Sequence, residues 1–137
     1  IAPSLVGSEM CIRDRYDSNA YNDDIPYVIK QNDRKFVIIP YSFDTNDMRF
    51  DGNNGFVQGD DFNIYCKESF NQILRETDDG SLRMMSIGLH PRIIGRPGRI
   101  KGLEDFIKHI KTYQNVWIPK RIDIAKYCLE KNLFNFF

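Results

Sequence analysis

The chain lacks any long hydrophobic run and any excess of one charge. No apolar segment approaches the roughly 20 residues that a membrane-spanning helix needs, because charged residues interrupt every hydrophobic stretch. We therefore expect a soluble protein that does not bind a membrane. Lys and Arg together number 19, and so do Asp and Glu, so no overall field would draw the chain onto nucleic acid. Any recognition of a charged ligand must be local.

Cysteine and histidine are also scarce. The three cysteines, Cys11, Cys66 and Cys128, are far apart and form no C-x-x-C pair, which argues against a disulfide framework or a zinc knuckle and for a reducing, cytoplasmic setting. The two histidines, His90 and His109, do not have metal-ligand spacing. The nucleophile elbow, the phosphate-binding loop and the dinucleotide fingerprint are all absent. We expect no metal and no cofactor.

Residues 1–15 differ in origin from the rest of the chain. The stretch Ser4 to Arg15, SLVGSEMCIRDR, resembles a translated sequencing adaptor, and the chain does not begin with Met. We interpret residues 1–15 as a non-native leader and expect the natural sequence to begin near Tyr16, truncated on its N-terminal side. A disordered leader is the alternative. We therefore consider the fold from Tyr16 onward.

Short apolar runs alternate with amphipathic segments along the rest of the chain. Residues 16–34 are rich in Asp, Asn and Tyr and predict irregular structure with turns. Buried strands are predicted by three runs, KFVIIPY, MMSIGL and NVWIP, at residues 35–41, 84–89 and 115–119. Apolar side chains that recur at steps of three and four predict helices over residues 59–77, 99–113 and 121–132. Three strand-then-helix units indicate an α/β fold with a parallel sheet, either doubly wound or part of a βα barrel.

Candidate functional residues follow the predicted strands. In parallel α/β folds ligands bind at the carboxyl ends of the strands, where Asp44 and Asp47 follow the first strand and His90 follows the second. A histidine can give and take a proton near neutral pH, so His90 is a candidate acid or base, although a purely structural loop histidine is the alternative. Asp44 and Asp47 either orient a catalytic partner, bind substrate amides, or only form turns.

Three arginines, Arg92, Arg96 and Arg99, lie close to the N-terminus of the predicted helix 99–113. A helix N-terminus already carries partial positive charge, so cations there are unfavourable unless an anion compensates them. The compensating anion is either a bound ligand or a carboxylate of the chain. The candidate carboxylates are Asp44, Asp47, Asp51, Asp60 and Asp61. Gly95, Pro97 and Gly98 are interpreted as requirements of a tight turn.

Four blocks of sequence resemble a known family. The blocks YDSNAYNDDIPY, IPYSFDTNDMRF, MMSIGLHPRIIGRPGR and VWIPKRIDIAKY, in this order, resemble the C-terminal part of the metal-independent allantoinases of the polysaccharide deacetylase (NodB-homology) superfamily. The resemblance covers Tyr16 to Tyr127. It implies an α/β fold in which residues 16–137 supply about three βα units, the C-terminal half of a distorted (β/α)7 barrel with parallel strands. The catalytic base and any metal motif would then lie upstream of Tyr16.

The resemblance also implies roles for individual residues. The fourth motif of these deacetylases resembles Trp-x-x-Asp-x-x-Asp-Trp, and Tyr41, Asp44, Asp47 and Met48 occupy it here, with both tryptophans replaced. The histidine of the fifth motif serves as the general acid, and His90, directly after Leu89, occupies that position. The implied catalytic residues are His90, Asp44 and Asp47. The implied substrate-binding residues are Arg92, Arg96, Arg99 and Tyr41. Pro91 stands where the family usually has cysteine.

The function that this resemblance implies is a cytoplasmic hydrolase of purine catabolism that converts allantoin, a small-molecule substrate, to allantoate. Two alternatives remain open. One is a metal-dependent polysaccharide or chitin-type N-deacetylase, and the other is a non-catalytic anion-binding fragment. We expect the isolated chain to be inactive and the full-length protein to be a homo-oligomer, with the apolar tail FNFF at residues 134–137 as one contact.

Overall fold

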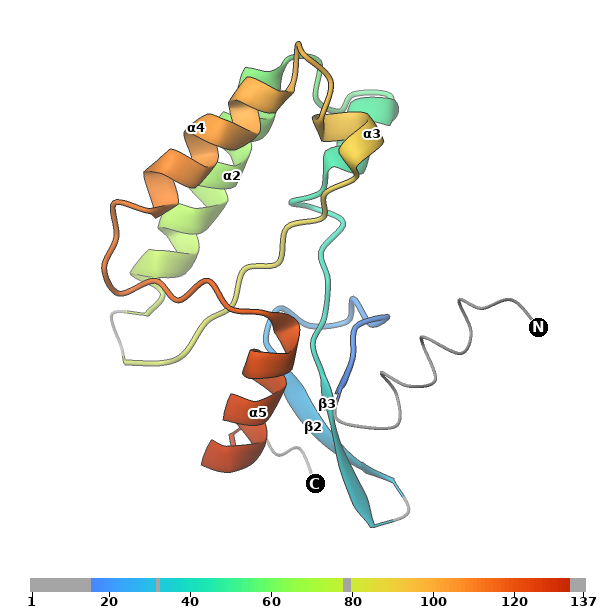
Figure 1. The fold of residues 1–137 in the computed structure, drawn as a ribbon, viewed down its shortest axis with the longest axis vertical. Coiled ribbons are helices and arrows are strands. Elements are labelled where there is room, and N and C mark those ends of the chain that lie inside the picture. Colours follow the sequence, from blue (N-terminus) through green and yellow to red (C-terminus); the bar gives the residue numbers. More distant parts are fainter. Residues whose placement is uncertain (1–15, 32, 78–79, 134–137) are drawn as a thin grey trace, which may run out of the picture. The chain divides into compact units, whose positions relative to one another are not determined.

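The computed structural model describes residues 16–31, 33–77 and 80–133 (Figure 1). They belong to two compact units. Unit 1 comprises residues up to Tyr41 together with those from Ile118 onward, and unit 2 spans Ser42–Trp117. The leader at residues 1–15 and the FNFF tail lie outside the described residues, so their interpretation stays a prediction. No helix within the described ranges is long and apolar enough to cross a membrane.

Unit 1 contains a small mixed sheet with one helix. Its strands are β1 (Tyr16–Asp17), β2 (Tyr27–Gln31) and β3 (Arg34–Ile38), in the order β1-β3-β2. β1 runs parallel to β3, whereas β2 and β3 form an antiparallel hairpin. The helix α5 (Arg121–Lys131) packs on β2 and β3 (Figure 1). Val37, Ala125 and Cys128 are almost fully buried and form part of this unit's core.

Unit 1 confirms one prediction and contradicts another. The helix predicted over residues 121–132 is confirmed by α5. The irregular structure predicted for residues 16–34 is confirmed for residues 18–26 and wrong for the strands β1 and β2. The chain reverses at Asp33, whose φ of 60° lies in the left-handed region. Aspartate tolerates that conformation better than most residues, so the polar stretch that suggested a loop is a hairpin turn.

Unit 2 is built on two packed helices, α2 (Gly59–Arg75) and α4 (Ile100–Ile110), which lie side by side in Figure 1. Both helices were predicted. Their shared core contains Phe62, Cys66 and Phe70 from α2 and Phe106 from α4. Burial raises the pKa of the Cys66 thiol to about 12, so this cysteine is neutral at physiological pH and serves packing. Ile107, an apolar residue of α4, is 37% exposed.

The N-terminus of α2 is capped by its own first turn. Asp61 Oδ2 accepts hydrogen bonds from the backbone N–H groups of Val57 and Gln58, both at 2.8 Å. These bonds favour the charged carboxylate and hold the pKa of Asp61 below its ordinary value. The cap fixes where α2 begins, and thereby where the long loop before it ends.

Two of the three predicted strands do not form, although their residues are described. The segments 84–89 and 115–119 are not assigned as strands, and the single parallel bridge in this part of the chain joins Asn46 to Gly88. A strand needs a regular ladder with a neighbouring strand along its length, and the described residues form only this isolated bridge in the two segments. The first predicted strand is present as β3. The α/β class is therefore confirmed, whereas three parallel βα units are not seen.

Two glycines set the close approach of α2 and α4. A Cβ added to Gly102 would lie 1.9 Å from the carbonyl oxygen of Gly59. We predict that Gly102→Ala lowers the free energy of unfolding by about 2 kcal/mol, because the helices must separate to make room. Gly98→Ala is the matched control, since a Cβ there meets no atom within 4 Å, and its effect should stay within about 0.5 kcal/mol. Urea denaturation of the full-length polypeptide that carries this chain measures the free energy of unfolding of both variants. Equal values for the two would contradict the close contact of the helices.

Candidate functional site

A buried aspartate and a half-exposed histidine form the central pair of unit 2. Asp47 begins the 3-10 helix η1 (Asp47–Asp51), and His90 directly precedes the short helix α3 (Pro91–Ile94). Asp47 Oδ1 lies 2.6 Å from His90 Nδ1, and the Asp47 side chain is 0% exposed while that of His90 is 37% exposed. The structure therefore brings together two residues that are 43 positions apart in the sequence.

The second carboxylate oxygen of Asp47 fixes the backbone around His90. Asp47 Oδ2 accepts hydrogen bonds from the backbone N–H of His90 at 2.6 Å and of Ile94 at 3.3 Å. One side chain thus caps α3 and holds the histidine ring. A carboxylate only accepts hydrogen bonds, so the hydrogen of the contact with the ring lies on Nδ1 and the other ring nitrogen, Nε2, remains for chemistry.

A parallel backbone bridge places the two residues beside each other. Asp47 N donates to Gly88 O at 3.0 Å, and Gly88 N donates to Thr45 O at 3.0 Å. The Thr45 hydroxyl donates to Ser86 O at 2.6 Å and tightens the same junction. Because the bridge ends two residues before His90, the histidine leaves the junction at a defined point next to Asp47.

Asp44 has different partners from Asp47. Tyr65 donates its hydroxyl hydrogen to Asp44 Oδ1 at 2.6 Å, and Arg49 lies 3.5 Å from the same oxygen. The bond to Asp44 raises the pKa of Tyr65. The Arg49 guanidinium lies 4.5 Å from the ring centre of Phe56 and 4.3 Å from that of Tyr65. Asp44 therefore anchors its loop to α2, and Asp47 is the aspartate that orients His90.

The three candidate arginines differ in their surroundings. Arg99 covers the Phe50 ring at 4.4 Å and is partly used in packing. Arg96 Nε donates to Arg92 O at 3.1 Å, and the residues Arg92 and Arg96 are both exposed. None of the three forms an ion pair with a carboxylate among the described residues. The intramolecular ion pairs considered from the sequence are therefore wrong for this part of the chain.

The remaining sequence predictions have mixed outcomes. Tyr41 belongs to unit 1, where its ring packs edge-on against Tyr21 at 5.7 Å. A Cβ on Gly95 would lie 2.3 Å from Pro91 O, so the need for glycine at that position is confirmed. Gly98 has no such constraint. Its predicted backbone requirement is wrong, because an added Cβ would meet open space.

Comparison with known proteins decides the family. No family model matches the chain. A Schizosaccharomyces pombe protein named as a polysaccharide deacetylase is 38% identical over 120 residues, which cover 81% of this chain and 38% of that protein. The crystal structure of PuuE allantoinase matches with a TM-score of 0.81 and 39% identity, covering 95% of this chain and 44% of that one. A Pseudomonas aeruginosa PAO1 structure, also named as a polysaccharide deacetylase, matches with a TM-score of 0.81 and 37% identity. The match covers 97% of this chain and 45% of that one.

The chain belongs to the polysaccharide deacetylase superfamily. Relatives of this superfamily are named as hydrolases of two kinds, deacetylases and an allantoinase. The chain spans 38% of the length of the curated relative that it matches. It also covers less than half of the two solved chains, 44% and 45%.

The described residues of this chain contain no cluster of side chains that could form a metal site. Within residues 16–31, 33–77 and 80–133, no group of three or more His, Cys, Asp or Glu side chains could hold a metal ion. The described residues therefore do not form a metal site by themselves, and no catalytic step is assigned to a metal.

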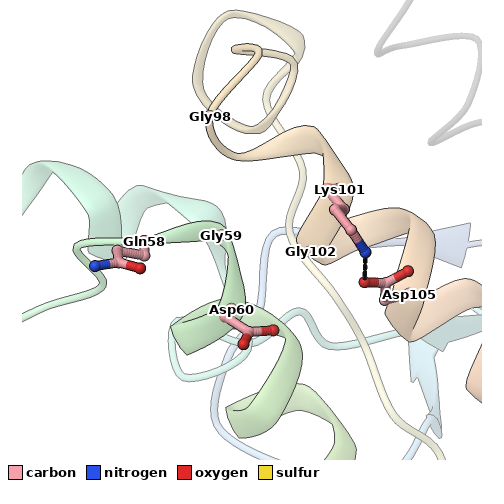
Figure 2. A pocket seen from close by; sticks show the side chains of 7 residues that line it. All are labelled: Gln58, Gly59, Asp60, Gly98, Lys101, Gly102 and Asp105. Atoms are coloured by element: carbon pink, nitrogen blue, oxygen red, sulfur yellow. Dashed lines mark hydrogen bonds and ion pairs between the residues drawn. The ribbon is translucent and has the colours of Figure 1, made fainter.

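A pocket elsewhere in unit 2 contains none of the predicted site residues. It has a volume of about 560 Å³ and lies where the first turns of α2 and α4 meet (Figure 2). Its lining residues are Gln58, Gly59, Asp60, Gly98, Lys101, Gly102 and Asp105. Lys101 and Asp105 form an ion pair with each other in this pocket (Figure 2), which satisfies two of its charged groups internally.

Several residues of the site were not predicted. Thr45, Asn46 and Gly88 form the junction, while Arg49 and Tyr65 anchor Asp44. Gly88 carried a usable signal, because a glycine inside an apolar strand pattern often marks the close approach of another backbone. Arg49 and Tyr65 carried none, since a long-range cation–π contact leaves no local pattern in the sequence.

We predict that the two aspartates differ sharply in their contribution to stability. Asp47→Ala leaves two backbone N–H groups and a ring nitrogen without their acceptor in a buried position, and should lower the free energy of unfolding by about 3 kcal/mol. Asp44→Ala removes contacts from a side chain that is 63% exposed, and should cost about 1 kcal/mol or less. Urea denaturation of the full-length polypeptide that carries this chain measures the free energy of unfolding of both variants. A larger loss for Asp44→Ala would contradict the division of roles.

Proposed function

We propose that residues 16–137 supply the C-terminal half of an allantoinase-type hydrolase that opens the cyclic amide of allantoin to give allantoate in purine catabolism. The observation that carries the proposal is the His90–Asp47 pair, with Asp47 buried and the histidine side chain 37% exposed. A proton donor held by a buried carboxylate suits cleavage of a C–N bond. The 39% identity to an allantoinase of known structure favours allantoin as the substrate.

The proposed reaction needs an acid at the ring nitrogen. Water adds to the amide carbonyl carbon, a C–O bond forms, and the C–N bond to the ring nitrogen breaks. The nitrogen would leave as an unstable anion unless it gained a proton as the bond breaks. In our proposal, protonated His90 gives that proton from Nε2 while Asp47 holds Nδ1–H and keeps the ring in place. The remaining protein residues of such an enzyme would supply the base for the attacking water.

The arginines have a separate proposed role. Arg92 and Arg96 are exposed and form no ion pair with the described carboxylates, so they are available to an anion. We propose that one or both stabilise the negative charge that develops on the carbonyl oxygen or the carboxylate of the product. Arg99 is less available, because it covers Phe50. Tyr41 is retained as a proposed substrate-binding residue.

A polysaccharide N-deacetylase is the second candidate, because two relatives carry that name. Both reactions cleave an amide C–N bond and both would use the same proton donor. They differ in the substrate, a small cyclic ureide against an N-acetylated glycan, and in the need for a metal motif outside the described residues. Assaying the full-length polypeptide that carries this chain with allantoin and with an N-acetylglucosamine oligomer, each with and without added divalent metal, separates the two.

We predict that His90→Ala in that full-length polypeptide lowers kcat for allantoin at least about 100-fold, because the leaving nitrogen loses its proton donor. KM should change less than kcat, since the histidine acts mainly in the transition state. His109→Ala is the matched control, because it removes the other histidine, which contacts Asn71 and Phe70. It should leave kcat within a few-fold of the wild type. An unchanged kcat for His90→Ala would overturn the assignment of His90 as the proton donor. Absence of hydrolysis by the wild type, with salt-sensitive anion binding retained in His90→Ala, would favour the non-catalytic alternative.

We also predict that residues 16–137 alone are inactive. The chain covers less than half of its solved relatives, 44% and 45%. The half barrel that the resemblance implies would leave parallel strand edges unpaired, which disfavours a stable isolated fold. A thermal scan followed by an allantoin assay tests this. A cooperative transition together with measurable hydrolysis would contradict the prediction.

A further inference from the structure

We propose that Asn46 is a positioning residue for the His90–Asp47 pair. In this inference, which rests on the proposed function, the Asn46 side chain touches no substrate. It fixes the backbone from which Asp47 projects and the surface on which the His90 segment rests. Three observations support this role: the burial of the side chain, the use of both ends of its amide, and its contact with Gly88.

The Asn46 amide is buried, and both its nitrogen and its oxygen form hydrogen bonds. The residue is 4% exposed. Its Nδ2 donates to Ser42 O at 3.2 Å, and its Oδ1 accepts from Met48 N at 2.9 Å. One side chain therefore ties the start of the turn to the first residues of η1, on both sides of Asp47. Asparagine suits this position because its amide carries a donor and an acceptor at one end of a short side chain.

Gly88 packs directly against the same amide. A Cβ added to Gly88 would lie 2.1 Å from Asn46 Nδ2 and 2.5 Å from Cγ, so only glycine allows this approach. Asn46 and Gly88 are also the partners of the parallel bridge. Asp47 follows Asn46 by one residue, and His90 follows Gly88 by two. The amide is thus held between the two segments that carry the pair and sets their separation.

Loss of this amide should affect the pair specifically. The contact between Asp47 Oδ1 and His90 Nδ1 is short, at 2.6 Å, and depends on where both backbones lie. A displacement of η1 by a fraction of an ångström would lengthen it and allow the hydrogen of the neutral ring to move from Nδ1 to Nε2. Such small misplacements of a catalytic group are costly in rate even when the fold survives.

The test replaces Asn46 and reads the state of the His90 ring directly. Asn46→Ala removes the whole amide. Asn46→Asp is the isosteric variant, because it keeps the shape of the side chain and the acceptor for Met48 N and loses the donor to Ser42 O. The matched control is Asn63→Ala, which removes another buried asparagine amide, at 6% exposure, whose Nδ2 donates to Asp60 Oδ1 at 3.1 Å within α2. All variants are made in the full-length polypeptide.

Three measurements are made on each variant: the free energy of unfolding, kcat and KM for allantoin, and the ¹⁵N chemical shifts of the His90 ring, assigned by difference from His90→Gln. We expect Asn46→Ala and Asn46→Asp to lower kcat about ten- to a hundredfold with little change in KM, and to shift the ¹⁵N signals away from a pure Nδ1–H tautomer. Asn63→Ala should also lower the free energy of unfolding, but should leave both the ring signals and kcat near those of the wild type.

Two outcomes would overturn the inference. One is an unchanged His90 spectrum in a folded Asn46 variant, and the other is an equal spectral change in Asn63→Ala. If Asn46→Ala does not fold, Asn46→Asp decides. Absence of allantoin hydrolysis by the wild type would refute the proposed function alone, because the ring spectrum still reports whether Asn46 positions the pair.

Discussion

The hydrogen bonds of one buried carboxylate determine the geometry of the candidate site. Asp47 is 0% exposed and accepts from the His90 ring, the His90 backbone and the Ile94 backbone. A buried carboxylate without these partners would be strongly unfavourable, so the segments that supply them must lie where they do. The bridge between Asn46 and Gly88, the cap on α3 and the orientation of the histidine all follow from that requirement.

Within the loop that carries Asp44 and Asp47, one aspartate has a structural role and the other holds the histidine. Asp44 and Asp47 are three residues apart, yet Asp44 joins the loop to α2 through Tyr65 and Arg49, whereas Asp47 holds His90. The loop that carries both aspartates thereby holds His90, which lies on another segment of the chain, in a fixed orientation. A similar division applies to the arginines, since Arg99 covers an aromatic ring while Arg92 and Arg96 remain exposed.

Membership of the polysaccharide deacetylase superfamily is consistent with this division. The relatives are named as deacetylases and as an allantoinase, so a shared proton donor with variable surroundings is a reasonable common element. In this chain the variable part includes Tyr41 and Met48, which stand where the resembled motif has tryptophan. These replacements change the size and polarity of two side chains of the fourth motif without touching the contact between Asp47 and His90.

The sequence by itself determined the helices, the family and the identity of the main chemical groups. The helices α2, α4 and α5 were predictable because periodic burial of side chains such as Phe62, Cys66 and Phe106 is a local property. The motif order was likewise enough to single out His90, Asp44 and Asp47. The hairpin of β2 and β3 was missed because Asn and Asp serve both loops and tight turns. Only the tertiary structure decided which aspartate holds the histidine, which arginines stay exposed and that Asn46 lies against Gly88. Those outcomes depend on contacts between residues about 40 positions apart, and such contacts leave no periodic or local signal in the chain.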